Sequence, residues 1–463
     1  MPPEKLAYAL ARYSRSPDSI RASLEWVRTH DSSKFLESFY FQYGHASIAD
    51  LGHVALCFEG ISELAAIEIE DEPLWDGQAR SSRYQDFSRS GFITPPELDA
   101  TAAAEYRRAG DALLAAYQEV HARMVEHLTL RLPRPESMKP EAYQRNIAAR
   151  AFDVARYLLF LGVQTGVGQV TSIRTLEKQI RRWKASPYQE LRSIGEETAA
   201  ACALPPACAL DGAAQEPLAP TLAKYVDADD YPLRVRARLR EWAAQNLSAA
   251  APEPAPLVDL IRPTEALADI AATLLYPVTQ RSFRSLYEQV RGWSRARQAE
   301  VLDVALASRT GRDELLREFR GGLYAYDMLI DIGAYRDLHR HRRCQQYRQD
   351  FGWLHGWETP APIEAANLAA VYAQALNAAQ TAAAALPGPA TEYLLPFAMR
   401  SRFLFKMDFA EAEYIARLRS GVKGHFSYRA IAWAMKQRME ELEPELGRLI
   451  EATPPWVEDP LVR

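Results

Sequence analysis

The segment from Tyr335 to Arg348 reads YRDLHRHRRCQQYR, and five of its fourteen residues are arginines. Guanidinium groups this close together repel one another unless an anion lies among them. Each can hold a phosphate, or the carbonyls of an oxidised ring, through two parallel hydrogen bonds. The segment therefore predicts a local anion-binding site, and the alternative is a solvated basic face. Its charged or titratable members include Arg336, His339, Arg340, His341, Arg342, Arg343 and Arg348.

The remainder of the chain is not basic. Its 463 residues, a length typical of two or three domains, carry a net charge of −5. No general positive field exists to attract nucleic acid, so we expect no nucleic-acid partner. No apolar run is long enough to span a bilayer, and we expect no membrane association. The N-terminus lacks an apolar signal core, which indicates no targeting segment.

Cysteine usage favours a reducing cytoplasm as the location of the protein. The chain has four scattered cysteines, in neither a zinc-binding spacing nor a disulfide framework: Cys57, Cys202, Cys208 and Cys344. The acidic run at 68–76 contains no histidine, so we read it as a solvated loop and expect no metal site.

Long periodic segments rich in Ala, Leu, Glu and Arg predict a mostly helical chain. Candidate helices cover 100–130, 148–160, 362–385 and 410–419. Candidate strands are few and short, at 54–58, 83–87 and 256–261.

The composition changes between about 204 and 255, where Pro/Ala-rich stretches flank one predicted helix at 233–245. This segment has the character of a connector. We therefore expect three parts: a first module at 1–203, the connector at 204–255, and a second module at 256–463.

The segments on either side of the connector resemble each other in the same order. Residues 8–27 resemble 274–290, residues 155–165 resemble 391–401, and residues 183–197 resemble 422–436. Arg192 and Arg429 fall in register, and we read both as structural arginines that close a helix pair. Three matches in one order predict an internal duplication, and the alternative is chance similarity between helices of similar composition.

One known family resembles these segments. FYFQYGHASIADLGHVALCFEGIS at 39–62 resembles the opening motif of the flavin-dependent thymidylate synthases, a Gly-His-x-Ser/Thr turn followed by an acid and by Glu-Gly-Ile-Ser. Arg340-His341-Arg342 resembles their Arg-His-Arg signature, and Ser81-Ser82-Arg83-Tyr84 resembles their Ser-x-Arg-Tyr segment. The resemblance implies an α+β fold, predominantly helical, made of two tandem modules like those synthases. Each module is then a small antiparallel sheet packed with helices.

Departures from the family pattern are complementary in the two halves. The first half has Asp71-Glu72-Pro73 at the place of the triplet but keeps the opening motif and the Ser-x-Arg segment. The second half keeps the triplet, lacks the Gly-His turn, and has Asp408 for the family asparagine and Glu392 where the first half has Arg156. We therefore expect one composite site shared by the halves, and an inactive reciprocal site that holds Asp71, Glu72 and Glu392.

The resemblance implies a role for each residue that matches a family motif. In that family reduced FAD carries hydride, NADPH reduces the flavin, and methylenetetrahydrofolate supplies a carbon to C5 of dUMP. Arg419 and His45 would be catalytic, and Arg419 would stabilise the charge that develops on the pyrimidine. The residues expected at the FAD are Arg340, His341, Arg342, Ser47, Asp50 and Arg174. Those expected at the nucleotide substrate are Ser81, Arg83, Arg156 and Arg336.

Because family members build each site between subunits of a homotetramer, the resemblance implies a homodimer of this chain, forming a pseudo-tetramer. The small-molecule partner would be a nucleotide. Two alternatives remain open from the sequence. One is a flavoenzyme that acts on another pyrimidine nucleotide in a specialised pathway. The other is a non-catalytic homologue, repurposed to bind nucleotide or flavin, which the loss of the asparagine favours.

Overall fold

The structure is a computed structural model of the chain. It describes residues 1–30, 36–37, 46–206, 216–221, 223–247, 255–261, 265–310, 316, 318, 323–407, 409–442, 447 and 450–461. His45 and Asp408, which the sequence singles out, lie outside the described residues.

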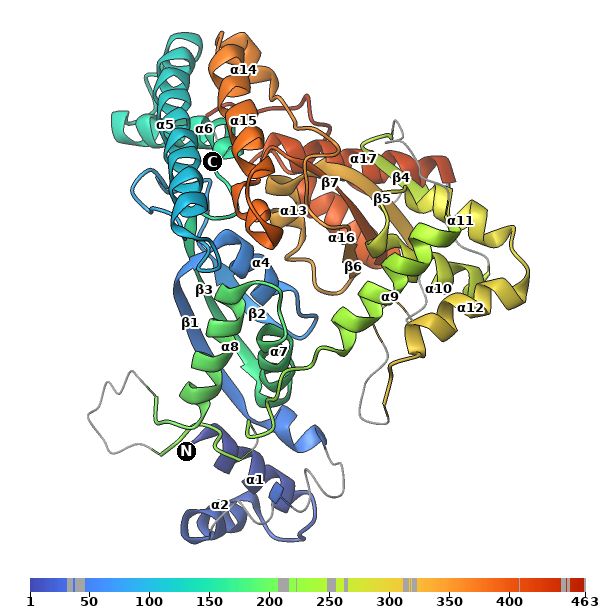
Figure 1. The fold of residues 1–463 in the computed structure, drawn as a ribbon. Coiled ribbons are helices and arrows are strands. Elements are labelled where there is room, and N and C mark those ends of the chain that lie inside the picture. The colour runs from blue at the N-terminus through green and yellow to red at the C-terminus, as the bar shows by residue number, and fades with distance from the viewer. Residues whose placement is uncertain are drawn as a thin grey trace.

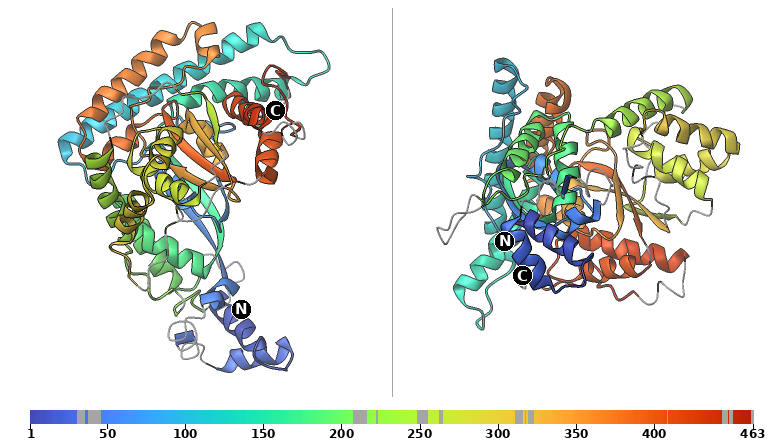
Figure 2. Two further views of the ribbon diagram at one scale, coloured as in Figure 1. Left: turned by 90° about the vertical axis from the view of Figure 1, so that its right-hand side faces the viewer. Right: turned by 90° about the horizontal axis from the view of Figure 1, so that it is seen from below.

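The first half is built on a three-stranded antiparallel sheet with strand order β1-β3-β2. The strands are β1 (His53–Ser62), β2 (Asp76–Ala79) and β3 (Gln164–Ser172). Its helices are α1 (Pro3–Tyr13), α2 (Ile20–Thr29), α4 (Glu63–Glu70), α5 (Ala100–Arg131), α6 (Pro140–Ala155), α7 (Ile173–Lys184) and α8 (Gln189–Cys202). Short 3-10 turns are η2 (Ala46–Leu51) and η3 (Arg156–Leu158). Helices α1 and α2 lie together at one end of the molecule (Figure 1, Figure 2).

The second half is built on a four-stranded antiparallel sheet with strand order β4-β5-β7-β6. The strands are β4 (Val258–Ile261), β5 (Tyr324–Asp331), β6 (Gln345–Arg348) and β7 (Arg400–Met407). Its helices are α9 (Tyr231–Asn246), α10 (Ala266–Leu275), α11 (Phe283–Arg291), α12 (Arg295–Leu306), α13 (Ile332–Leu338), α14 (Ala361–Ala365), α15 (Ala369–Ala384), α16 (Phe409–Ser420) and α17 (Phe426–Leu442). Two further 3-10 turns are η4 (Tyr276–Val278) and η6 (Gly388–Leu394). The predicted class, α+β and predominantly helical, is confirmed.

The order of elements repeats between the halves, as the sequence matches predict. With α6 of the first half and α14 of the second set aside, the series β1-α4-β2-α5-β3-α7-α8 recurs as β5-α13-β6-α15-β7-α16-α17. The interval between the end of one strand and the start of the next is the same, from 62 to 76 and from 331 to 345. This places Asp71-Glu72-Pro73 at the positions of Arg340-His341-Arg342. An acidic turn and a basic turn therefore occupy equivalent places in the two halves.

The two halves are joined by a short antiparallel pairing. The N–H groups of Leu161 and Gly162 donate to the carbonyls of Leu395 and Tyr393 at 3.0 and 2.7 Å. The reverse bonds run from Phe397 N–H to the Leu159 carbonyl at 2.7 Å and from Ala398 N–H to the Tyr157 carbonyl at 3.1 Å. Helix α5 packs along α15 from the other half (Figure 1). One hydrophobic core consequently runs through both halves.

Two of the predicted elements differ from the structure, and a third has a larger role than expected. The predicted strand at 83–87 is wrong, because this segment forms turns and Arg83 is held by a buried ion pair with Asp153. The predicted helix at 362–385 is interrupted at Asn367, whose φ is 56°. The helix predicted at 233–245 is confirmed as α9, but it is not a bare connector: its buried face joins the core that α10, α11 and α12 share.

The sheets differ in how one face is covered. In the second half Ala325, Tyr347 and Leu404 lie at most 1% exposed in the core that includes α9–α12. On the corresponding face of the first sheet, Ala55 and Cys57 of β1 are exposed, and Val170 of β3 is 47% exposed. Within the described residues, no helix of the first half covers this face as α9–α12 cover the second. We call it the open sheet face.

Candidate functional site

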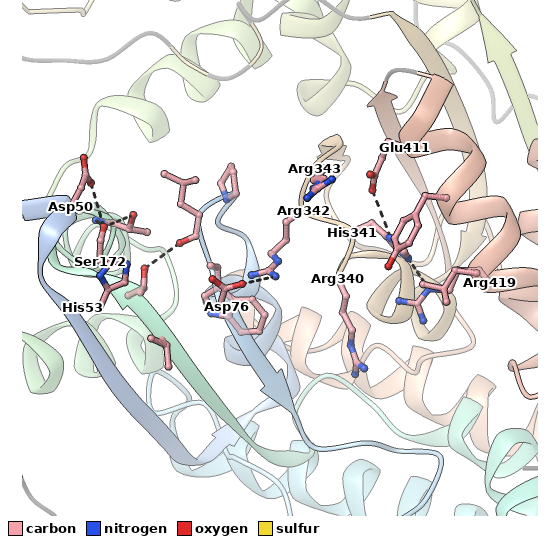
Figure 3. A pocket seen from close by; sticks show the side chains of 18 of the residues that line it. Asp50, His53, Asp76, Ser172, Arg340, His341, Arg342, Arg343, Glu411 and Arg419 are labelled. Atoms are coloured by element: carbon pink, nitrogen blue, oxygen red, sulfur yellow. Dashed lines mark hydrogen bonds and ion pairs between the residues drawn. The ribbon is translucent and has the colours of Figure 1, made fainter. Parts of the chain in front are cut away.

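A cavity of about 1080 Å³ lies between the halves (Figure 3). Its volume is slightly above the ~300–1,000 Å³ typical of small-molecule sites. The first half contributes Asp50, His53, Trp75, Asp76, Val170 and Ser172 to the wall, among others. The second half contributes Arg340, His341, Arg342, Arg343, Glu411 and Arg419. We call this space the composite cavity.

The basic turn reaches the composite cavity because a short helix delivers it there. Asp331 ends β5 and caps α13, accepting a hydrogen bond from the N–H of Ala334 at 2.7 Å. Helix α13 ends at Leu338, and the chain then turns before β6 begins at Gln345. Arginine side chains in this turn can point away from the core, whereas those on a helix face packed against a sheet could not. The sequence segment that holds the triplet is thus set at the cavity wall.

Arg342 links the two halves across the cavity. Its Nη2 lies 2.8 Å from Oδ1 of Asp76 on β2, and its guanidinium lies 5.4 Å from the ring centre of Trp75. Trp75 is itself fixed, because its Nε1 donates to Oε1 of Gln169 at 2.6 Å. Arg342 is therefore oriented by first-half residues that the sequence reasoning did not single out.

Arg419 of α16 is oriented by His341. The Arg419 Nε donates to His341 Nε2 at 2.7 Å. Burial and the nearby Arg419 charge lower the pKa of His341 to about 3, so its imidazole is neutral at neutral pH. The contact between His341 Nδ1 and Glu411 Oε1 at 3.8 Å is therefore not a pair of opposite charges. The Arg419 guanidinium also lies 5.5 Å from the ring centre of Tyr428.

Two further cations line the composite cavity without being neutralised. Arg343 is exposed and Arg340 is half-buried. Among the residues that the structure describes, neither has a carboxylate within ion-pair distance. The charge of Arg340 acts from a greater distance on the carboxyl groups of Glu63 and Asp337. It favours the ionised form of both, and so opposes the effect of burial on their pKa values. This wall therefore has spare positive charge for an anion.

Of the three FAD contacts predicted in the first half, one lines the cavity and a second pairs with it. Arg174 Nη1 lies 2.9 Å from Oδ2 of Asp50, and the hydroxyl of Ser172 donates to Asp50 Oδ1 at 3.4 Å. Ser47 is exposed in η2. Asp50 lines the cavity, whereas Arg174 reaches it through Asp50. His45 lies outside the described residues, so its catalytic role stays a prediction.

The residues predicted to hold the nucleotide do not line the composite cavity. Three of them form buried ion pairs: Arg83 with Asp153 at 2.8 Å, Arg156 with Asp337 at 3.1 Å, and Arg336 with Glu63 at 2.7 Å. Each guanidinium is thereby paired with a carboxyl group of the chain itself. The hydroxyl of Ser81 accepts a hydrogen bond from the N–H of Arg83 at 3.3 Å.

The buried carboxylates of these pairs differ in protonation. Burial raises the pKa of Glu63 to about 7, even though Arg336 opposes this effect. Burial also favours the neutral form of Asp337, but Arg156 and three other arginines outweigh it and lower the pKa of Asp337. The Arg156–Asp337 pair is therefore charged at neutral pH, whereas Glu63 titrates near neutrality.

A metal centre has no support in the described part of the chain, where no group of three or more His, Cys, Asp and Glu side chains is placed to hold an ion. No described helix is long and apolar enough to cross a bilayer.

Comparison with known proteins gives the family. The family model described as thymidylate synthase complementing protein matches residues 1–203 and 257–445. The chain belongs to this family. The match of one family model to two segments agrees with the repeated order of elements, so the protein is a duplicated member of the thymidylate synthase complementing protein family.

Relatives that match over most of the chain carry names that state no activity. A UPF0159 protein of Chlamydia muridarum is 26% identical over 87% of this chain and 77% of its own length. A UPF0159 protein of Thermoplasma acidophilum is 23% identical over 96% of this chain and 94% of its own. A solved flavin-dependent thymidylate synthase of Helicobacter pylori, complexed with FAD and dUMP, is 12% identical with a TM-score of 0.28, and the match covers 43% of this chain and 89% of that one. The family assignment rests on the family model alone.

Proposed function

We propose that the composite cavity binds FAD, and that the protein is a flavin-dependent transferase of one-carbon units to C5 of a uracil nucleotide such as dUMP. The observation that carries this proposal is the cavity wall, where Arg340, Arg342, Arg343 and Arg419 stand together. Of these four, only Arg342 has a carboxylate partner within the described residues. Membership of the thymidylate synthase complementing protein family supplies the reaction class.

The residues present fit a flavin dinucleotide. The diphosphate of FAD is an anion that Arg340 and Arg343 can hold through paired hydrogen bonds. The opposite wall offers apolar surface for a flat ring system, in Leu74, Trp75 and Val170. A cavity that is both cationic and partly apolar suits a ligand with a charged middle and two aromatic ends.

The bound flavin would supply hydride chemistry, with NADPH as its reductant and methylenetetrahydrofolate as carbon donor. The protein's share is orientation and charge. Neutral His341 accepts from Arg419 Nε and fixes that side chain, while no described residue accepts from its two terminal nitrogens. Arg419 is thus positioned to stabilise negative charge on a pyrimidine carbonyl. His341 is a positioning residue for Arg419.

A different substrate is the second candidate, and a specific observation favours it. Arg83 and Arg156, the expected phosphate ligands, are already bound by Asp153 and Asp337. A nucleotide monophosphate would have to displace a buried carboxylate at each position, which is costly. A non-catalytic flavin binder would not need these two arginines, and a flavoenzyme acting on another pyrimidine nucleotide would have to hold the phosphate elsewhere.

We further propose that two copies of the chain associate in the cytoplasm as a homodimer that forms a pseudo-tetramer. The open sheet face supports this, because it borders the composite cavity, which Val170 and Asp76 also line. Small side chains at its centre, such as Ala55 and Cys57, leave a flat surface on which a second copy can pack.

The test is a visible absorption spectrum of the purified full chain after incubation with FAD and desalting. A retained flavin band that bleaches with NADPH, and returns when dUMP and methylenetetrahydrofolate are added, supports the transferase. A retained band that no uracil nucleotide affects favours the second candidate. A colourless protein that cannot be reconstituted refutes flavin binding.

A further inference from the structure

A second, smaller cavity lies where the acidic turn faces the basic turn. Its volume is about 170 Å³. The first half lines it with Glu70, Asp71 and Glu72, and the second half with His339, Arg343 and Gln346, among others. Because 71–73 is equivalent to 340–342, and 76–77 to 345–346, this space is the duplicated counterpart of the composite cavity. We call it the acidic cavity.

The imidazole of His339 presents an acceptor that no described residue uses. Its Nδ1 lies 2.8 Å from Gln346 Oε1, and Gln346 Nε2 donates to the His341 carbonyl at 2.6 Å. That second bond fixes the amide so that its oxygen faces His339, and Nδ1 donates to it. The hydroxyl of Tyr335 lies 3.0 Å from the same nitrogen, so both neighbours of this ring edge are on Nδ1. The other ring nitrogen, His339 Nε2, is then a hydrogen-bond acceptor. The side chain is 5% exposed, and Nε2 has no hydrogen-bond partner among the described residues.

Glu70 offers a second unused acceptor on the other side of the acidic cavity. The side chain is 7% exposed, and its Oε1 has no hydrogen bond within the described residues. A buried acceptor without a donor costs about 1–3 kcal/mol, so its persistence beside a cavity points to a donor that binds there. Glu72 is partly compensated, since Arg182 lies 3.7 Å away.

We propose that the acidic cavity binds an amino-substituted oxo-heterocycle of the pterin type. Such a ring carries adjacent N–H groups that donate to Glu70 and His339, beside a carbonyl that accepts from Arg343. The volume of about 170 Å³ admits a single ring system and is too small for a dinucleotide. The site that the sequence predicts to be inactive would thus bind a ligand through carboxylates, whereas the composite cavity would bind an anion through arginines.

This inference extends the proposed function without depending on it. Methylenetetrahydrofolate carries a pterin ring, and both cavities are lined by Arg342 and Arg343, so ligands in the two cavities would lie on either side of these arginines. Binding in the acidic cavity is nonetheless measurable on the full chain with no flavin added. Failure of FAD binding and failure of pterin binding are therefore separate results.

The experiment titrates the full chain with 2-amino-4-oxopteridine and follows the fluorescence of the ligand. Lumazine is the matched probe, because it has the same bicyclic ring with a carbonyl in place of the amino group. We expect saturable one-to-one binding of the pterin, with lumazine weaker by about tenfold or more. Glu70→Gln should weaken pterin binding to a similar extent, and Glu119→Gln, on the exposed side of α5, should not change it.

Equal affinity for pterin and lumazine in the wild-type chain would overturn the proposal, and so would no saturable binding at all. An unchanged affinity in a folded Glu70→Gln variant, with folding checked by circular dichroism, would also overturn it. The comparison of the two ligands needs no variant, so the proposal stays testable even if Glu70→Gln does not fold.

Discussion

Arg336 of the second half and Glu63 of the first form an ion pair of 2.7 Å in which the carboxylate is fully buried. Glu63 is the first residue of α4, and the equivalent residue in the second half is Ile332. Arg336 is the fifth residue of α13, and the equivalent residue in the first half is Ile67. One hydrophobic position in each half is thus equivalent to one charged position in the other. The halves have diverged so as to bind each other.

The stability of the chain should fall as the pH rises toward 8, because of Glu63. Its folded pKa of about 7 lies above the ordinary value of 4.5, so the folded state keeps a proton that the unfolded state has lost. The contribution of Glu63 to the free energy of unfolding is fully present below pH 4.5 and is lost as the pH rises through 7. The total loss is about 3 kcal/mol at most. Glu63→Gln should flatten this part of a urea-unfolding profile. Glu119→Gln should keep the wild-type slope, and a Glu63→Gln profile parallel to the wild type would contradict the assignment.

Arg83→Ala should destabilise the fold by about 3–5 kcal/mol, because it leaves Asp153 buried without its cation. Arg83 also donates to the hydroxyl of Tyr428 at 2.8 Å and to the Lys423 carbonyl at 3.1 Å. Denaturant unfolding measures the loss, and the double variant Arg83→Met, Asp153→Leu should recover much of it. A variant that keeps wild-type stability but no longer binds nucleotide would instead assign Arg83 to the substrate.

Arg343→Ala should weaken FAD binding by about tenfold or more while leaving the unfolding free energy unchanged. The side chain is exposed, and no described carboxylate pairs with it, so its removal leaves no buried charge uncompensated. Isothermal titration at two salt concentrations should show a weaker salt dependence than in the wild type, since one cation is lost. Arg107→Ala on α5 is the matched control. Equal effects of the two variants would mean that only net charge matters.

Gly162→Ala should disrupt the pairing of the halves, at a cost of about 1–3 kcal/mol. A Cβ on Gly162 would overlap the hydroxyl of Tyr106 and would lie 3.1 Å from the carbonyl oxygen of Tyr393 in the other half. Gly352→Ala is a suitable control, because a Cβ there meets no atom within 4 Å. Thermal unfolding of both variants gives the comparison, and equal melting temperatures would refute the steric argument.

If a second copy covers the open sheet face, Cys57 should react with Ellman's reagent more slowly as the protein concentration rises. Cys57 is exposed in the single chain, whereas Cys202 and Cys344 are buried. Burial raises the pKa of those two thiols to about 11 and about 12, so they should stay nearly silent. The Cys57→Ser variant gives the background, and a rate independent of concentration would contradict packing on this face.

The sequence was sufficient for features that repeat or that carry a fixed spacing. The duplication and the equivalence of the two turns follow from order and interval, and helices α5, α9 and α16 follow from the periodic composition of their segments. Arg192 and Arg429 were read as structural, and both hold a backbone carbonyl, of Ser186 at 2.6 Å and of Ser420 at 3.0 Å. These contacts are local, so neighbouring residues in the chain determine them.

Long-range charge pairing is what the sequence could not reveal. Nothing near Arg156 indicates that Asp337, 181 residues away, would neutralise it. The same holds for the contribution of Trp75 and Asp76 to the cavity, because the sequence of one turn does not show which turn of the other half lies opposite it. The equal lengths of 62–76 and 331–345 show that the two turns are equivalent, but their positions in space follow only from the way the two halves pair.

The antiparallel pairing of 157–162 with 393–398 has a consequence for how such a molecule diverges. In a dimer of identical subunits, a turn beside the symmetry axis meets its own copy, so an acid there meets an acid and a base meets a base. Joining the two copies in one chain removes that restriction. Asp71 and Arg340 can then hold opposite signs at one ancestral position, and a single ancestral pocket can become two pockets with different ligands.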